Sequence, residues 1–109
     1  MPKPSDLLQG TLDLLILKLL ARESAHGWSI SKQIQVLSGD VLSVGQGSLY
    51  PALHRLEHQG WITAEWKDSD VGRSTKVYAL TREGRKQLDR ELRTWQRLSS
   101  AVQLLIDNA

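Results

Sequence analysis

Between residues 46 and 58 the sequence places many hydrogen-bonding side chains around a narrow apolar stripe. Leu49, Leu53 and Leu56 follow one another at spacings of four and three, which predicts a short helix with one buried face. A helix of this size can fold without a strongly polar outer face. The pattern therefore favours recognition of a nucleic acid. The side chains that can hydrogen-bond to base edges and phosphates are Gln46, Ser48, Tyr50, His54, Arg55 and His58.

Two residues with special backbones indicate the ends of this helix. Gly60 predicts its end, because glycine readily adopts the conformation that follows a last helical turn. Pro51 lacks an amide hydrogen and is expected in the first turn, which places the start near Gly47 or Ser48. The first two turns are therefore expected to contact the nucleic acid.

A hairpin is expected directly after the helix. Residues 61–67 and 74–80 have β-type composition, and the intervening turn at 68–72 is too long for a two-residue loop. A helix that leads into a hairpin is the layout of a recognition helix and its wing. In such folds the helix enters the major groove of DNA, and the wing reaches the neighbouring backbone or minor groove.

Basic residues are concentrated in the second half of the chain. Residues 1–45 hold four basic and four acidic groups, whereas residues 46–97 hold ten basic and seven acidic groups. This distribution fits a nucleic-acid partner but does not establish one. Arg55 can reach a guanine edge, although a phosphate contact fits it equally well. Further candidates for phosphate contacts are Lys32 before the recognition helix, and Arg73 and Lys76 on the wing.

Nothing in the sequence favours catalysis. There is no glycine-rich phosphate loop after a strand and no nucleophile elbow. His54 and His58 stand four residues apart and could share a metal ion, but no third ligand is evident. His26 is better explained as a turn or capping group than as a catalytic base. We therefore expect neither an enzyme nor a metal site, and no cofactor.

The N-terminal part of the chain is unusually apolar. Residues 7–20 contain nine Leu or Ile in fourteen positions, distributed almost all the way round a helical wheel. This run is too short and too charged to span a bilayer, and no cleavage site follows it. A chain of 109 residues forms one compact unit and has little material to bury such a helix, so we expect a second copy to cover it. With no cysteine in the sequence, a cytoplasmic location is expected.

Two further helices complete the expected order. One begins near Trp28 and stops at residues 38–40, and the other runs from Arg82 to about Ile106 with Thr81 as its N-cap. The last helix carries a long apolar stripe that nothing else in the chain can cover, which favours a two-fold dimer. The residues expected at that interface are Leu88, Leu92, Trp95, Leu98, Val102 and Leu105.

The four tryptophans have different expected roles. Trp28, Trp61 and Trp66 lie where core or hairpin packing explains them. Trp95 lies midway along the expected dimerisation helix. It is interpreted either as an anchor of the interface or as a wall of a small-molecule pocket.

The whole pattern predicts an α+β fold, mainly α: a winged helix-turn-helix domain over residues 1–81 and a long C-terminal dimerisation helix over 82–109, in one compact unit. Three motifs make the chain resemble the PadR family of bacterial transcriptional regulators, and the short, acidobacterial-type members in particular. They are His26-Gly27-Trp28, Gly47-Ser48-Leu49-Tyr50-Pro51-Ala52-Leu53-His54-Arg55-Leu56-Glu57 and Tyr78-Ala79-Leu80-Thr81-Arg82-Glu83-Gly84.

The resemblance implies a homodimer that represses transcription by binding an inverted repeat in double-stranded DNA. It also implies that the C-terminal helix packs against the N-terminal helix of the partner. Some relatives bind aromatic effectors at the dimer centre beside a tryptophan, to which Trp95 corresponds by position. An alternative function is therefore an effector-sensing dimer whose ligand controls DNA release. A third is a winged helix used only for protein–protein contacts.

Overall fold

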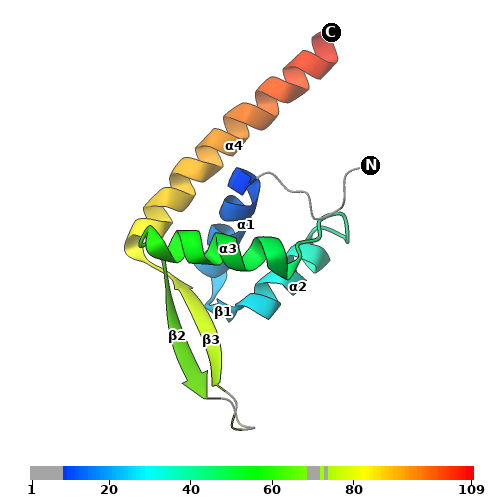
Figure 1. Ribbon diagram of the computed structural model, residues 1–109. Coiled ribbons are helices and arrows are strands. Elements are labelled where there is room, and N and C mark those ends of the chain that lie inside the picture. Colours follow the sequence, from blue (N-terminus) through cyan, green and yellow to red (C-terminus); the bar gives the residue numbers. More distant parts are fainter. Residues whose placement is uncertain (1–8, 69–71, 73) are drawn as a thin grey trace.

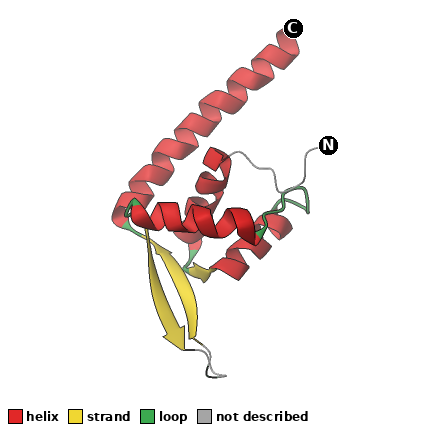
Figure 2. Cartoon of the chain, in the orientation of Figure 1, coloured by secondary structure: helices red, strands yellow, loops and turns green. Residues whose placement is uncertain are grey.

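The computed structural model describes residues 9–68, 72 and 74–109, and it is mainly helical with one small sheet (Figures 1 and 2). This is the α+β, mainly α architecture that the sequence predicts. Three helices precede a hairpin, and a long helix follows it. The elements are α1 (Gln9–Arg22), β1 (Ala25–His26), α2 (Gly27–Leu37), α3 (Gln46–His58), β2 (Ile62–Asp68), β3 (Ser74–Leu80) and α4 (Arg82–Asn108).

The sheet has three antiparallel strands in the order β1-β3-β2. Strands β2 and β3 form the expected hairpin, with Ile62 opposite Leu80 and Asp68 opposite Ser74. The two-residue strand β1, which the sequence did not predict, pairs with β3 beside Tyr78 and Val77. So short a strand has no periodicity of its own, and its pairing depends on where the hairpin lies.

Helix α1 lies at the centre of the molecule, and α2, α3, α4 and β3 all pack against it. Leu12, Ile16, Leu17 and Leu20 are buried within this single chain. The expectation that a second copy is needed to cover the far side of this helix was therefore wrong for most of its surface. The other elements surround α1 closely enough to bury even an almost wholly apolar helix.

Helix α3 begins one or two residues earlier than expected, with Gly45 at its N-cap. Pro51 consequently lies in the second turn, not in the first as predicted. The end agrees with the prediction: Gly60 has a φ of 79°, and its amide donates to the Glu57 carbonyl at 3.0 Å. The Trp61 amide donates to the Leu56 carbonyl at 3.1 Å, which completes a Schellman motif.

Helix α4 begins as predicted, with Thr81 at its N-cap accepting a hydrogen bond from the Gly84 amide at 2.9 Å. Its first half packs against α1, and there Leu88 is only 4% exposed. The prediction that Leu88 belongs to a dimer interface was therefore wrong, because its own chain already buries it. The second half of α4 projects away from the other elements (Figure 1).

Candidate nucleic-acid interface

Helix α3 separates its buried side chains from its polar ones. Four residues are buried against the core: Leu49, Ala52, Leu53 and Leu56. The opposite side is exposed, and its Tyr50 lines one hollow together with residues of the hairpin. The hairpin follows α3 directly in the chain (Figure 1). The exposed side chains predicted to contact DNA are Gln46, Ser48, Tyr50 and His54. The first turns of α3 therefore present hydrogen-bonding groups without burying them.

A hydrogen bond from the preceding helix holds the start of α3. The Ser31 hydroxyl of α2 donates to the Val44 carbonyl at 3.0 Å, just before α3 begins. Tyr50 makes a second connection, since its ring lies directly against the backbone of Gly27 at the start of α2. These contacts connect α2 to the residues just before α3 and to the second turn of α3.

Arg55 differs from the other candidates on α3 because it is partly buried and has a partner within the protein. Its Nη2 donates to Oδ1 of Asp13 in α1 at 2.6 Å, and both side chains are partly buried. Burial raises the pKa of Asp13, an effect that Arg55 opposes and that nearby Glu91 in α4 reinforces. Arg55 thus has an ionic partner inside the protein, which gives it a role in connecting α3 to α1.

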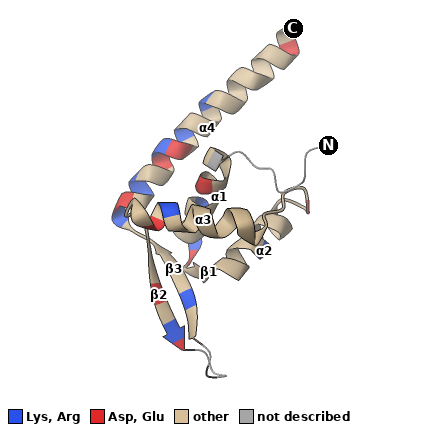
Figure 3. Cartoon of the chain, viewed as in Figure 1, with Lys and Arg blue, Asp and Glu red and all other residues tan. Residues whose placement is uncertain are grey.

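The basic candidates on other elements differ in their surroundings (Figure 3). Lys32 is exposed on α2. Lys76 on β3 lies 3.6 Å from Oε1 of Glu57, and its Nζ lies 5.5 Å from the centre of the Tyr78 ring. Arg73 lies outside the described residues. The N-terminal half of α3 carries no charged side chain, so its contacts with DNA have to come from neutral groups.

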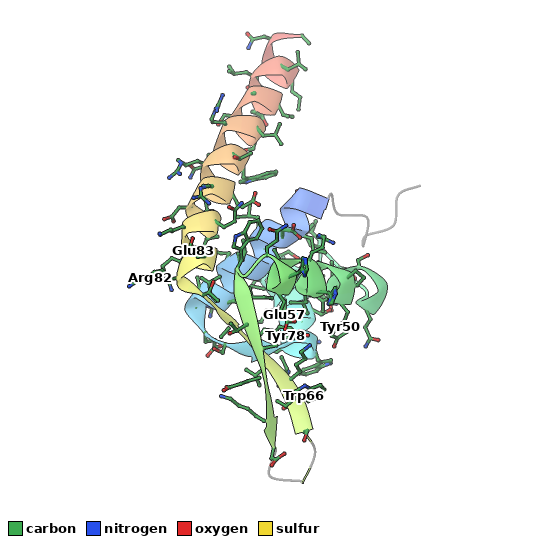
Figure 4. The ribbon with its side chains drawn as sticks, turned by 60° about the vertical axis from the view of Figure 1, so that its left-hand side comes forward. Tyr50, Glu57, Trp66, Tyr78, Arg82 and Glu83 are labelled. Carbon is green, nitrogen blue, oxygen red and sulfur yellow. The ribbon has the colours of Figure 1, made fainter. Side chains whose placement is uncertain are left out.

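An open hollow of about 590 Å³ lies between the start of α2, α3 and the hairpin. Trp28 is 67% exposed and Trp66 is 69% exposed, so the prediction that packing explains them was wrong. Trp61, in contrast, is partly buried against the core as expected. In Figure 4, Trp66 lies on the hairpin and Tyr50 on the adjacent helix. We call this space the aromatic hollow; its lining residues are His26, Gly27, Trp28, Tyr50, Trp66, Ser74, Thr75, Lys76 and Tyr78.

Sequence reasoning missed the functional candidates Trp28 and Trp66, although one signal was available. Trp66 has the same strand parity as Ile62, which is buried, so both face the same side of the sheet. Burial falls along β2 because the hairpin extends beyond the helices that would cover that side. The length of the hairpin relative to the expected core could therefore have indicated an exposed Trp66.

A second hollow, of about 210 Å³, lies between the N-terminal end of α1 and the middle of α4. Trp95 lines it and is 44% exposed. Leu92, from the predicted interface, packs partly against the core, whereas Leu98, Val102 and Leu105 are exposed. Both interpretations of Trp95, as an interface anchor and as a pocket wall, are compatible with this position.

Among residues 9–68, 72 and 74–109 there is no group of three side chains that could hold a metal ion. His26 occupies the N-cap position of α2 but makes no capping hydrogen bond through its side chain. Within the same residues, no helix is long and apolar enough to cross a membrane.

Comparison with known proteins identifies relatives across most of the chain. The family model described as "Transcriptional regulator PadR-like family" matches residues 16–90. The transcriptional regulator Rv3488 of Mycobacterium tuberculosis is 36% identical over 89 residues, which cover 82% of this chain and 79% of the relative. The transcriptional regulator YqjI of Escherichia coli is 34% identical over 80 residues, which cover 73% of this chain but 37% of the relative.

Solved structures show the same fold. A transcriptional regulator from Clostridium thermocellum superposes with a TM-score of 0.83 at 27% identity, over 91% of this chain and 96% of the other. A PadR-like transcriptional regulator from Bacillus cereus superposes with a TM-score of 0.78 at 28% identity, over 94% and 97% of the two chains.

Proposed function

The chain belongs to the PadR-like family of transcriptional regulators, and from that membership we propose that it is a homodimeric repressor that binds an inverted repeat in double-stranded DNA. Proteins of this family are DNA-binding regulators and not enzymes. The dimer, the repression and the inverted repeat are the parts that we add. We place this activity in the cytoplasm, where the DNA of a bacterial cell lies.

The observation that carries the proposal is the exposed polar side of α3 next to the hairpin. We assign base-edge contacts to Gln46, Ser48, Tyr50 and His54, which project from a helix whose opposite side is buried. Phosphate contacts are assigned to Lys32, Lys76 and Arg73. Arg55, which is paired with Asp13, is assigned the support of α3 in place of a direct base contact.

A dimer would cover the exposed apolar residues of α4. Leu98 is 51% exposed although it lines the hollow between α1 and α4, and Val102, which does not line that hollow, is 49% exposed. So many neighbouring apolar side chains are rarely left in water on a monomer. We propose that residues 82–109 form the dimerisation part, and that residues 1–81 form the part that binds DNA. A two-fold axis would then present α3 twice, about 34 Å apart, to successive turns of a palindrome.

The proposal is tested by titrating the protein against the DNA upstream of its own gene in a mobility-shift and footprinting experiment. The expected footprint has two symmetric half-sites, and Ser48→Ala or His54→Ala weakens binding to both. A reporter gene behind the same DNA should be less active when the protein is present. A single asymmetric half-site would contradict the dimeric reader, and increased reporter activity would contradict repression.

The second candidate function is an effector-sensing dimer, and the hollow beside Trp95 favours it. Leu14 and Leu98 provide apolar walls there, and Glu91 and Thr94 provide polar groups. Small aromatic compounds should then quench the fluorescence of Trp95 and release DNA, and Trp95→Leu should abolish both effects. Quenching without release would leave Trp95 as an interface anchor only. A protein that binds no DNA at any salt concentration would favour a role in protein–protein contacts.

A further inference from the structure

The aromatic hollow between α3 and the hairpin has no role in the function argued so far. We propose that one sugar–phosphate strand of the DNA passes through it and is held by the indole rings of Trp28 and Trp66. This inference rests on the proposed function, since it requires α3 in the major groove. It adds an apolar contact with the sugar–phosphate strand to the polar contacts that α3 is proposed to make with the bases.

The position of the hollow follows from the shape of DNA. The major groove and the neighbouring minor groove are separated by one sugar–phosphate strand. A protein with a helix in one groove and a hairpin tip in the next has that strand in the space between them. In this molecule the aromatic hollow lies between α3 and the hairpin. Two of its lining residues, Tyr50 on α3 and Trp66 on the hairpin, are labelled in Figure 4.

The register of the hairpin directs Trp66 and Lys76 into this space together. They are directly opposite each other on β2 and β3, so their side chains lie on the same face of the sheet. Ala64 and Tyr78 form the next pair on that face, and there Tyr78 is buried against the core. The face that packs on the core at one end of the hairpin therefore lines the hollow nearer its tip.

Trp28 also lines the hollow but comes from a different part of the chain than Trp66. It belongs to the first turn of α2, and its ring centre is 6.3 Å from that of His26. Each of the two indoles exposes more than two thirds of its surface. Large apolar rings that face one hollow next to a DNA-reading helix indicate a surface that a partner covers.

The groups in the hollow match the chemistry of a DNA strand. The C–H groups of deoxyribose can pack on the indole faces, and an indole N–H can donate to a phosphate oxygen. Among the described residues, Lys76 is the lysine that lines the hollow, and Glu57 at 3.6 Å partly balances its charge. Asp68, near the hairpin tip, accepts a hydrogen bond from the Ser74 hydroxyl at 3.0 Å and adds a further negative charge. Most of the described residues that line the hollow are aromatic or uncharged, so we expect its contact with DNA to depend mainly on apolar packing.

This chemistry gives the two tryptophans a distinctive signature in binding experiments. The salt dependence of DNA binding reports the number of phosphates neutralised by cations. Trp28→Ala and Trp66→Ala should each weaken binding about tenfold, from the loss of buried apolar area, without changing the slope of log K against log salt. Lys76→Ala should instead reduce that slope by about one.

The experiment measures the affinity of each variant for two duplexes of equal length at several salt concentrations. One duplex carries the DNA upstream of the gene, and the other has a random sequence. Since a backbone contact does not read sequence, Trp28→Ala and Trp66→Ala should weaken both by the same factor. Val41→Ala is the matched control, because Val41 is an equally exposed apolar residue that does not line the hollow. It should bind both duplexes as the unchanged protein does.

A second measurement needs no substitution in the protein that binds DNA. The four tryptophans are labelled with 5-fluorotryptophan, and their fluorine resonances are assigned from single variants. Addition of the random duplex should shift the resonances of Trp28 and Trp66 and leave that of Trp61, which packs on the core, in place. This measurement decides the question even if a variant at Trp28 or Trp66 fails to fold.

The possible results separate this inference from the proposed function. If the unchanged protein binds DNA but the resonances of Trp28 and Trp66 do not move, the inference is overturned and the proposed function stands. A reduced salt slope in Trp66→Ala would also overturn it, because the substitution would then act by displacing Lys76. If the unchanged protein binds neither duplex, the proposed function fails first.

Discussion

The ring of Tyr50 in α3 lies so close to Gly27 in α2 that a Cβ atom at residue 27 would stand 2.9 Å from both Cε1 and Oη of the ring. No other residue type would leave room for Tyr50 in this position. The contact joins the start of α2 to the side of α3 that we propose reads DNA. It also explains why the His26-Gly27-Trp28 motif contains a glycine although the backbone there has an ordinary helical conformation.

Gly27→Ala should therefore impair DNA binding more than folding. The added methyl meets the far end of a side chain that can rotate away, so the free energy of unfolding should fall by less than about 1 kcal/mol. The displaced Tyr50 loses about one hydrogen bond to DNA, which corresponds to roughly fivefold weaker binding. Urea unfolding and duplex titration measure the two effects. Ser29→Ala, in the same helix but outside the aromatic hollow, removes a hydrogen bond from Gln33 and should leave the affinity for DNA unchanged.

Gly84→Ala, unlike Gly27→Ala, should mainly lower the stability of the fold. A Cβ atom at residue 84 would overlap the Trp61 carbonyl oxygen, and a backbone group cannot rotate away. The start of α4 would have to move from the hairpin, at a cost of about 2–4 kcal/mol. Gly10→Ala is the control, since that helical glycine has open space around it and should gain up to about 1 kcal/mol. Equal stabilities of the two variants would contradict this packing.

Gly47→Ala separates stability from recognition within α3. Nothing lies within 4 Å of a Cβ at residue 47, so the helix should gain about 0.5 kcal/mol from the substitution. If the first turn of α3 approaches base edges as proposed, the same methyl should weaken binding to the upstream DNA by at least about tenfold. Thermal unfolding and duplex titration of one variant measure both values. A more stable variant with unchanged affinity would show that this turn does not approach the DNA closely.

The Asp13–Arg55 pair predicts how stability depends on pH. Burial raises the pKa of Asp13 in the folded state above its unfolded value of 3.8, so the folded protein favours the protonated carboxyl. The resulting cost is absent below pH 3.8 and grows as the pH rises through the folded pKa. Asp13→Asn removes this titration. The stability of Asp13→Asn relative to the unchanged protein should therefore be more favourable at pH 7 than at pH 3.

Urea unfolding of both proteins between pH 3 and pH 7 measures this difference. The change should be confined to the pH range just above 3.8. Lys32→Ala, a variant on α2 outside the pair, should not reproduce it. A relative stability that becomes less favourable for Asp13→Asn as the pH rises would mean that Arg55, and not burial, dominates the pKa of Asp13.

Leu88 and Val102 share one apolar stripe of α4 but should respond differently to substitution. Leu88→Ala should cost about 2–4 kcal/mol of folding stability, because Leu88 is buried within its own chain. Val102→Asp should leave the isolated chain folded and, if the dimer forms through α4, convert it to a monomer. Urea unfolding measures the loss of stability in Leu88→Ala. Sedimentation equilibrium over a range of protein concentrations measures the mass of Val102→Asp. A Val102→Asp variant with unchanged mass would exclude this stretch of α4 from the interface.

Local patterns in the sequence were sufficient to predict the helices, the hairpin and their ends. Gly60 and Thr81 act on their immediate neighbours, and the spacing of Leu49, Leu53 and Leu56 identifies a buried face without any knowledge of what covers it. For the same reason the family could be identified, since its motifs lie in these continuous segments. Local sequence patterns therefore predict the four helices and the hairpin, their order and the polar side of α3, but not the short strand β1.

The burial and pairing of individual side chains, in contrast, depend on how the elements pack together. The stripe of α4 is continuous in the sequence, yet α1 buries Leu88 and leaves Val102 exposed, because α4 extends beyond the helices beside it. Trp66 is exposed for the same reason. The hairpin extends beyond the core, which buries Ile62 on the same face of the sheet. Arg55 forms its ion pair with Asp13, which lies forty-two residues earlier in the sequence. Periodicity records the direction in which a side chain points, whereas burial and pairing depend on where other elements end, and that is settled only when they pack.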